Sequence, residues 1–82
     1  MSDKIKQDIS IGANMRQLRQ NADMTQDAVA AQLQVMGLTA SREIVSQMEL
    51  GRYSVRVSVL LALCELYNAS ISDFFDGLSL KV

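Results

Sequence analysis

Residues 25–51 read TQDAVAAQLQVMGLTASREIVSQMELG, and this stretch decides the fold. It predicts two amphipathic helices, one from Thr25 to Gly37 and one from Ser41 to Gly51. Both start with a hydroxyl residue, whose oxygen can accept hydrogen bonds from the free N–H groups of the first helical turn. Both end at a glycine, which readily adopts the left-handed conformation of a helix C-terminus. A short connection between two such helices is typical of a helix-turn-helix motif.

The second of these helices has two chemically different faces. Steps of 100° per residue place Ile44 and Met48 on one side, with Val45 at its margin. The opposite side is mostly polar: arginine can hydrogen-bond to guanine, glutamine to adenine, and glutamate can accept from cytosine. A helix of this kind can enter the major groove of DNA by its N-terminus. The outward residues are Arg42, Glu43, Ser46, Gln47 and Leu50.

Three further helices are predicted around this pair, so the expected fold class is all-α with five helices. Ser10 is expected to cap the first helix. The fourth starts between residues 54 and 58 and runs to about Tyr67, where Asn68 is a left-handed stop. A capping box at residues 70–73 opens a short fifth helix. The stripe that the second helix is expected to bury is Val29, Ala30, Leu33 and Met36.

The length of 82 residues allows one domain. We expect this helical domain to span residues 10–76, preceded by an N-terminal extension over 1–9 and followed by a tail over 77–82. The tail alternates apolar and polar residues and is interpreted as a short strand or an irregular end. Since the chain has no proline or tryptophan and only two Phe and two Tyr, its core must be built from aliphatic residues, which suits packed helices.

The residue types that catalysis and metal binding need are scarce. The chain has no histidine, the usual general base and the commonest metal ligand. Its one cysteine, Cys64, lies in an apolar run and is predicted to be a small buried side chain. We therefore expect no catalytic residues, no metal and no cofactor, and hence no enzyme. Residues 57–64 are too few to cross a bilayer and residues 1–4 do not resemble a signal peptide, so we expect a cytoplasmic protein.

Six short motifs follow one another along residues 11–75. They are IG at 11–12, MRQLR at 15–19, MTQDAVA at 24–30, SREIVSQMELG at 41–51, LLALC at 60–64 and SISDFF at 70–75. In this order they resemble the Cro and phage-repressor family of helix-turn-helix proteins, also called the xenobiotic-response-element family. The resemblance implies a repressor-like fold in which the second and third helices form the motif. It also implies sequence-specific binding of double-stranded DNA.

The resemblance implies roles for individual residues. Gln26 matches a glutamine that contacts backbone phosphate and braces the recognition helix. Arg19 and Glu49 match a structural ion pair that ties the first helix to the end of the third. Arg16 and Arg52 are basic residues placed to contact phosphates. The candidate DNA-binding residues are Arg16, Gln26, Ser41, Arg42, Glu43, Ser46, Gln47 and Arg52.

Two features depart from a typical DNA-binding chain, and two lysines near the N-terminus are open to two interpretations. Leu50 stands where the family has a polar residue, so it is expected to contact a thymine methyl group or a partner protein. The net charge is −1 and the isoelectric point about 5.1, so specificity must rest on base contacts and shape more than on bulk charge. Lys4 and Lys6 either form a flexible basic arm that reaches the DNA or belong to an ordinary disordered N-terminus.

One recognition helix reads only a few base pairs, so we expect a homodimer that reads an inverted repeat. Two interpretations of function remain. The first is a transcriptional regulator, most simply a repressor, that reads DNA through residues 41–50. The second is an antitoxin or a protein-interaction module on the same scaffold, with a toxin or another protein as its partner. The candidate dimer-interface residues are Phe74, Phe75, Leu78 and Leu80.

Overall fold

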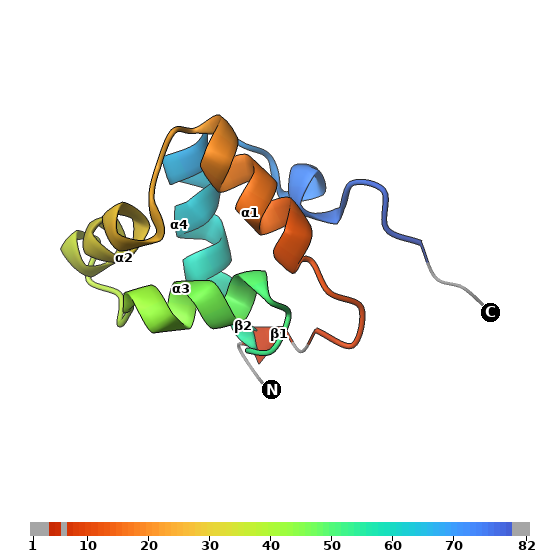
Figure 1. Cartoon of the computed structure of the whole chain (residues 1–82), viewed down its shortest axis with the longest axis horizontal. Coiled ribbons are helices and arrows are strands. Elements are labelled where there is room, and N and C mark those ends of the chain that lie inside the picture. The colour runs from red at the N-terminus through yellow and green to blue at the C-terminus, as the bar shows by residue number, and fades with distance from the viewer. Residues whose placement is uncertain (1–3, 6, 80–82) are drawn as a thin grey trace.

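The computed structural model describes residues 4–5 and 7–79. Within these residues the chain forms four α-helices, one 3₁₀-helix and one pair of two-residue strands. Strands β1 (Lys4–Ile5) and β2 (Val55–Arg56) pair antiparallel, with Lys4 opposite Arg56. Figure 1 shows α4 near the centre, with α1, α2 and α3 arranged around it. The helices are α1 (Gly12–Asn21), α2 (Gln26–Val35), α3 (Arg42–Glu49), α4 (Val57–Tyr67) and the 3₁₀-helix η1 (Ile71–Phe75).

The helix-turn-helix motif consists of α2 and α3, and both predicted caps are confirmed. The Thr25 hydroxyl accepts a hydrogen bond from the backbone N–H of Ala28 at 3.1 Å. The Ser41 hydroxyl accepts one from Ile44 at 3.2 Å. Between the helices Gly37 has φ +85°, which lets the chain turn immediately after α2. Because these contacts are local, the residues at which α2 and α3 begin are fixed by neighbouring side chains.

The expected all-α fold with five helices is confirmed only in part: the described residues are mostly helical, but they form four α-helices. Residues 71–75 form a 3₁₀-helix, although the predicted capping box is present and Asp73 accepts from the Ser70 N–H at 2.9 Å. This element is too short for α-helical pairing to extend, because the chain is extended at Asp76 and left-handed at Gly77. The strand pair was also not predicted. Of the expected C-terminal strand, residues 78–79 have no regular structure and residues 80–82 lie outside the described residues.

Two boundary details of the first and fourth helices also follow from local chemistry. The N-cap position of α1 is Ile11, one residue later than the predicted Ser10, and Ile11 makes no side-chain cap bond. The Ser10 hydroxyl nevertheless accepts from the Gly12 N–H at 3.0 Å and so satisfies a free N–H group at the start of α1. Asn68 ends α4 with φ 50°, as predicted. In each case one hydrogen bond or one backbone angle decides where the helix begins or ends.

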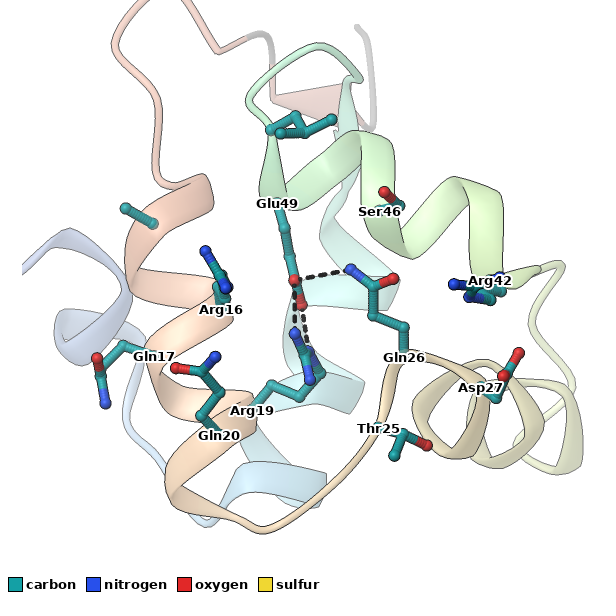
Figure 2. A pocket seen from close by; sticks show the side chains of 12 residues that line it. Arg16, Gln17, Arg19, Gln20, Thr25, Gln26, Asp27, Arg42, Ser46 and Glu49 are labelled. Atoms are coloured by element: carbon teal, nitrogen blue, oxygen red, sulfur yellow. Dashed lines mark hydrogen bonds and ion pairs between the residues drawn. The ribbon is translucent and has the colours of Figure 1, made fainter.

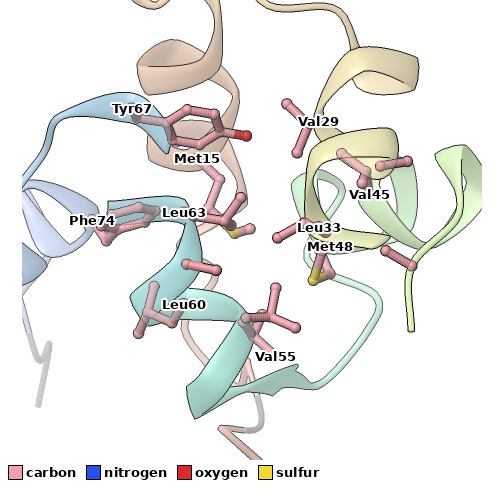
Figure 3. Close-up of a cluster of buried hydrophobic side chains, with 14 of the residues drawn as sticks. Met15, Val29, Leu33, Val45, Met48, Val55, Leu60, Leu63, Tyr67 and Phe74 are labelled. Atoms are coloured by element: carbon pink, nitrogen blue, oxygen red, sulfur yellow. The ribbon is translucent and has the colours of Figure 1, made fainter. Parts of the chain in front are cut away.

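The core consists of aliphatic side chains from all four α-helices, together with Val55 of β2 and two aromatic rings (Figure 3). In α2 the predicted stripe is correct except at Met36, which is 40% exposed because it is the C-cap, beyond the last helical residue. In α3 the order at the margin is reversed: Val45 is fully buried and Ile44 only half-buried. The core face of α3 is thus centred between Val45 and Met48, which leaves the opposite face open.

Phe74, a predicted dimer-interface residue, belongs to the core instead. Its side chain is 0% exposed and stacks on Tyr67, with ring centroids 6.5 Å apart. The Asn14 side chain fixes this segment to α1 by donating to the Phe74 carbonyl at 3.0 Å and to the Asp76 carbonyl at 2.9 Å. A domain this small gains more by burying an aromatic ring in its own core than by leaving it exposed. Phe74 is therefore unavailable to a partner.

Candidate nucleic-acid interface

The outer face of α3 carries the predicted base-reading side chains. Arg42, Glu43 and Gln47 are exposed and Ser46 is half-buried. Helix geometry places Arg42, Ser46 and Leu50 in one row, since they are four residues apart, and Glu43 and Gln47 in the neighbouring row. The Ser41 hydroxyl is used in the cap of α3. The face therefore presents a cation, an anion and an amide within two turns of the helix N-terminus.

A groove of about 930 Å³ lies beside one side of α3, between α1 and the start of α2 (Figure 2). We call it the first groove. It brings together four of the predicted DNA-binding residues: Arg16, Gln26, Arg42 and Ser46. Glu43 and Gln47 are not among its lining residues, because their row on α3 is turned away from it. The lining residues are Ala13, Arg16, Gln17, Arg19, Gln20, Thr25, Gln26, Asp27, Arg42, Ser46, Glu49 and Leu50.

A buried ion pair forms the floor of the first groove (Figure 2). Arg19 donates to Glu49 through Nε, 2.7 Å from Oε2, and through Nη2, 3.1 Å from Oε1. The hydrogen bond to Glu49 raises the pKa of Arg19 above its ordinary value, against the opposing effect of burial. The Arg19 Nη1 also donates to the Met24 carbonyl at 2.9 Å. One guanidinium thus joins α1, the segment before α2 and the end of α3.

Gln26 completes this network from the first residue of α2. Its Nε2 donates to Glu49 Oε1 at 3.1 Å, so the carboxylate accepts hydrogen bonds from two other elements. The Glu49 side chain is only 4% exposed, and buried carboxylates require such partners. This is the geometry expected of a bracing residue. The contact of Gln26 with phosphate, which the resemblance also implies, stays a prediction.

A second cleft, of about 740 Å³, lies on the other side of α3. Arg52 lines this cleft, so the structure separates it from Arg16 and Arg42. Among the described residues that line the cleft, three are basic and none is acidic. The other two basic residues are Lys4 and Arg56, which the pairing of β1 with β2 brings together. The lining residues are Lys4, Gly37, Leu38, Thr39, Ile44, Met48, Arg52, Tyr53, Ser54, Arg56, Ser58 and Val59.

Lys4 is a structured member of this surface, although residues 1–9 were expected to be an extension. A two-residue strand has no periodicity that a sequence could reveal. Lys6, considered together with Lys4 as an arm, lies outside the described residues. The one sequence signal was the apolar Ile5 between two lysines, which is too short a pattern to identify a strand.

The described residues hold few groups suited to other chemistry. Cys64 is half-buried, and burial together with the nearby Asp73 raises the pKa of its thiol. Across residues 4–5 and 7–79 there is no cluster of three or more His, Cys, Asp or Glu side chains that could hold a metal ion. No helix in the same part of the chain is long and apolar enough to span a bilayer.

A family model described as a helix-turn-helix domain matches residues 10–73. The match includes all four α-helices and the start of η1. It therefore includes α3 and the two sides of this helix that border the first groove and the second cleft. No curated protein and no solved structure gives a significant match to the chain. Proteins of this family are typically DNA-binding regulators without enzymatic activity. With its motif formed by α2 and α3, the chain belongs to the helix-turn-helix domain family.

Proposed function

We propose that the chain is a sequence-specific transcriptional regulator of the Cro and phage-repressor type, acting as a repressor that binds an inverted repeat as a homodimer. One observation carries this proposal. The exposed face of α3 presents Arg42, Glu43 and Gln47, while the residues on its inner side are buried. The helix also has a cleft on each side, and both clefts have basic side chains among their lining residues. This is the form that a helix inserted into the major groove requires.

The base contacts follow from the donors and acceptors of these three side chains. Arg42 donates two hydrogen bonds to guanine O6 and N7, Gln47 pairs with adenine N6 and N7, and Glu43 accepts from cytosine N4. Residues 42 and 47 are about 7.5 Å apart along the helix axis, since each residue adds about 1.5 Å. Base pairs stack about 3.4 Å apart, so this distance corresponds to roughly two base-pair steps. One subunit therefore reads a short half-site.

Phosphate contacts supply the remaining affinity. Arg16 borders the first groove, and Arg52 and Arg56 border the second cleft. Three or four such contacts per subunit give a dimer a salt slope on the order of −5 to −7, since each neutralised phosphate contributes about −0.9. This modest slope is compatible with a net charge of −1.

Dimerisation is proposed through the C-terminal segment. Ile71, Phe75 and Leu78 are exposed apolar side chains close together in sequence on η1 and after it. A two-fold interface there would pair two short half-sites one helical turn of DNA apart, about 34 Å. Leu80, also expected at this interface, lies outside the described residues. Sedimentation equilibrium from low to high micromolar concentration tests this part, and a strictly monomeric protein would contradict it.

Selection of bound duplexes from a random DNA pool at about 100 mM salt tests the function. We expect enrichment of an inverted repeat with half-sites about 10 base pairs apart. Arg42→Ala and Gln47→Ala, run in parallel, should each relax the preference at one position of the half-site and leave the others unchanged. Gln32→Ala is the matched control, because Gln32 is exposed on α2 and lines neither cleft. A folded protein that enriches no sequence would contradict the proposal.

A protein-interaction module or antitoxin is the second candidate, and an exposed apolar surface favours it. Val35 at the end of α2 is 82% exposed, and Met36 and Leu61 are exposed nearby. Met36 and Leu61 border a hollow of about 280 Å³ between α2 and α4. Exposed apolar groups that lie together often mark a contact with another protein. If no DNA sequence is enriched, a Val35→Ser, Leu61→Ser variant that loses a partner bound by the wild type would support this alternative.

A further inference from the structure

The position of α3 between two clefts has a geometric consequence for DNA binding. A helix with its side chains is about 10–12 Å wide and the major groove is about 12 Å wide. A helix in the major groove therefore has the sugar-phosphate backbone of one DNA strand along each of its two sides. The row of Glu43 and Gln47 lies between the first groove and the second cleft, so each cleft faces one of the two strands.

We infer that the N-terminal segment is part of the DNA interface: Lys4 joins Arg52 and Arg56 in binding the phosphate strand on the second side of α3, and Gln7 is the positioning residue that holds this surface. The inference rests on the proposed function, because it assumes that α3 enters the major groove. It adds to that function a phosphate-binding surface built from two segments that are about 50 residues apart in sequence.

The strand pair places the cations together. Lys4 of β1 is directly opposite Arg56 of β2, and opposed residues in an antiparallel pair have their side chains on the same face. Both side chains line the second cleft with Arg52, and both are exposed. Three cationic side chains are therefore close enough together to bind neighbouring phosphate oxygens.

Gln7 fixes this surface to α3. Its Nε2 donates to the Met48 carbonyl at 3.2 Å, near the end of α3, and to the Tyr53 carbonyl at 2.8 Å, in the loop before β2. Its Oε1 accepts from the Ile11 N–H at 3.0 Å, just before α1. One amide thus connects the N-terminal segment, α1, α3 and the loop that carries Arg52. Without it, the cations would lose their fixed distance from α3.

The close packing of Ser10 against the same loop provides a second anchor. Gly51, at the end of α3, has φ +75°, and a Cβ there would collide with the Ser10 side chain. The N-terminal segment therefore runs against the loop on both sides of Ile9, at Gln7 and at Ser10. This contact requires a glycine for space as well as for its backbone angle. The segment is thus built into the domain next to the second cleft.

The test measures binding of a fluorescent duplex of arbitrary sequence by anisotropy, between about 50 and 200 mM salt, because non-specific affinity reports phosphate contacts. Lys4→Gln should reduce the salt slope by about 0.9 per subunit. Lys4→Arg, the matched control, should keep the wild-type slope because it keeps the charge. Gln7→Ala should reduce the slope by more than Lys4→Gln, because it releases Arg52 as well. A residue that only stabilises the fold would lower the unfolding midpoint and leave the slope of the folded protein unchanged.

The outcomes separate this inference from the proposed function. A reduced slope in Lys4→Gln and Gln7→Ala, with the base preference of the wild type retained, supports the inference. Wild-type slopes in both variants overturn it and leave the proposed function intact. If the folded wild-type protein binds no duplex at all, both the proposed function and the inference are overturned.

Discussion

Replacing Glu49 by alanine perturbs the contact that holds α3 on the rest of the domain. The carboxylate accepts from Arg19 Nε at 2.7 Å, Arg19 Nη2 at 3.1 Å and Gln26 Nε2 at 3.1 Å. The side chains of Arg19 and Glu49 are 12% and 4% exposed. Water can therefore replace few of the hydrogen bonds that Arg19 and Gln26 lose when the carboxylate is removed. The substitution therefore leaves a mostly buried guanidinium, at the floor of the first groove, without its anion.

The expected loss is large relative to the stability of so small a domain. Removing one partner of a buried ion pair costs about 3–5 kcal/mol. A chain of 82 residues has a total free energy of unfolding of about 4–12 kcal/mol, at 0.05–0.15 kcal/mol per residue. Since each kcal/mol shifts the melting temperature of a domain this size by about 4–8 °C, Glu49→Ala should lower it by roughly 12 °C or more.

Urea titrations and thermal scans, both followed by circular dichroism, measure this loss. The matched control is the double variant Arg19→Met, Glu49→Leu, which removes both charges and should recover most of the lost stability. A Glu49→Ala variant within 1 kcal/mol of the wild type would refute the reasoning, because it would show that the buried pair contributes nothing net. A double variant no more stable than Glu49→Ala would refute it as well.

Three further predictions concern other parts of the domain. Gly12→Ala should reduce the free energy of unfolding by about 1–3 kcal/mol in urea titrations, because a Cβ at Gly12 would collide with the backbone carbonyl of Glu49; no measurable loss would contradict this. Burial raises the pKa of Tyr67, so the folded state keeps a proton that the unfolded chain releases above its ordinary value of 10.0. Stability present below about pH 10 should fall as the pH rises further, and Tyr67→Phe should make this fall shallower in urea midpoints taken at pH 8 and pH 11. Phe75→Ser should shift the sedimentation equilibrium toward monomer without a change in unfolding midpoint at low concentration, since Phe75 is exposed whereas its neighbour Phe74 is buried.

The parts of the fold that follow from neighbouring residues were predictable. Thr25, Ser41 and Asn68 act through hydrogen bonds or backbone angles within three or four residues, so their chemistry can be recognised in the sequence. The outer and inner sides of α3 were also predictable, because the α-helix has 3.6 residues per turn and this repeat determines which residues face the core to within one position. The reversal of Ile44 and Val45 marks that limit, because packing against α1 and α2 decides which margin of α3 is buried.

The parts that depend on distant contacts were not predictable. Gln7 donates hydrogen bonds to Met48 and Tyr53, which lie 41 and 46 positions further along the chain. Nothing near Gln7 in the sequence indicates those partners. The pairing of β1 with β2 likewise joins two strands of two residues each that are about 50 residues apart, and two residues are too few for a pattern of alternation. Phe74 and Phe75 are identical in type, and only the position of η1 against α1 and α4 decides that one is core and the other surface.

The central claim is that α3 enters the major groove by its N-terminus, and amide chemical-shift mapping of the ¹⁵N-labelled protein tests it most directly. The protein is titrated with a duplex of about 20 base pairs, enough for two half-sites one helical turn apart. We predict the largest shifts at residues 41–47 and at residues 25–27, which start α3 and α2, with little change at Leu61 and Glu65 on the outer side of α4. Shifts confined to α4 and η1, or no shifts at any duplex concentration, would contradict the account.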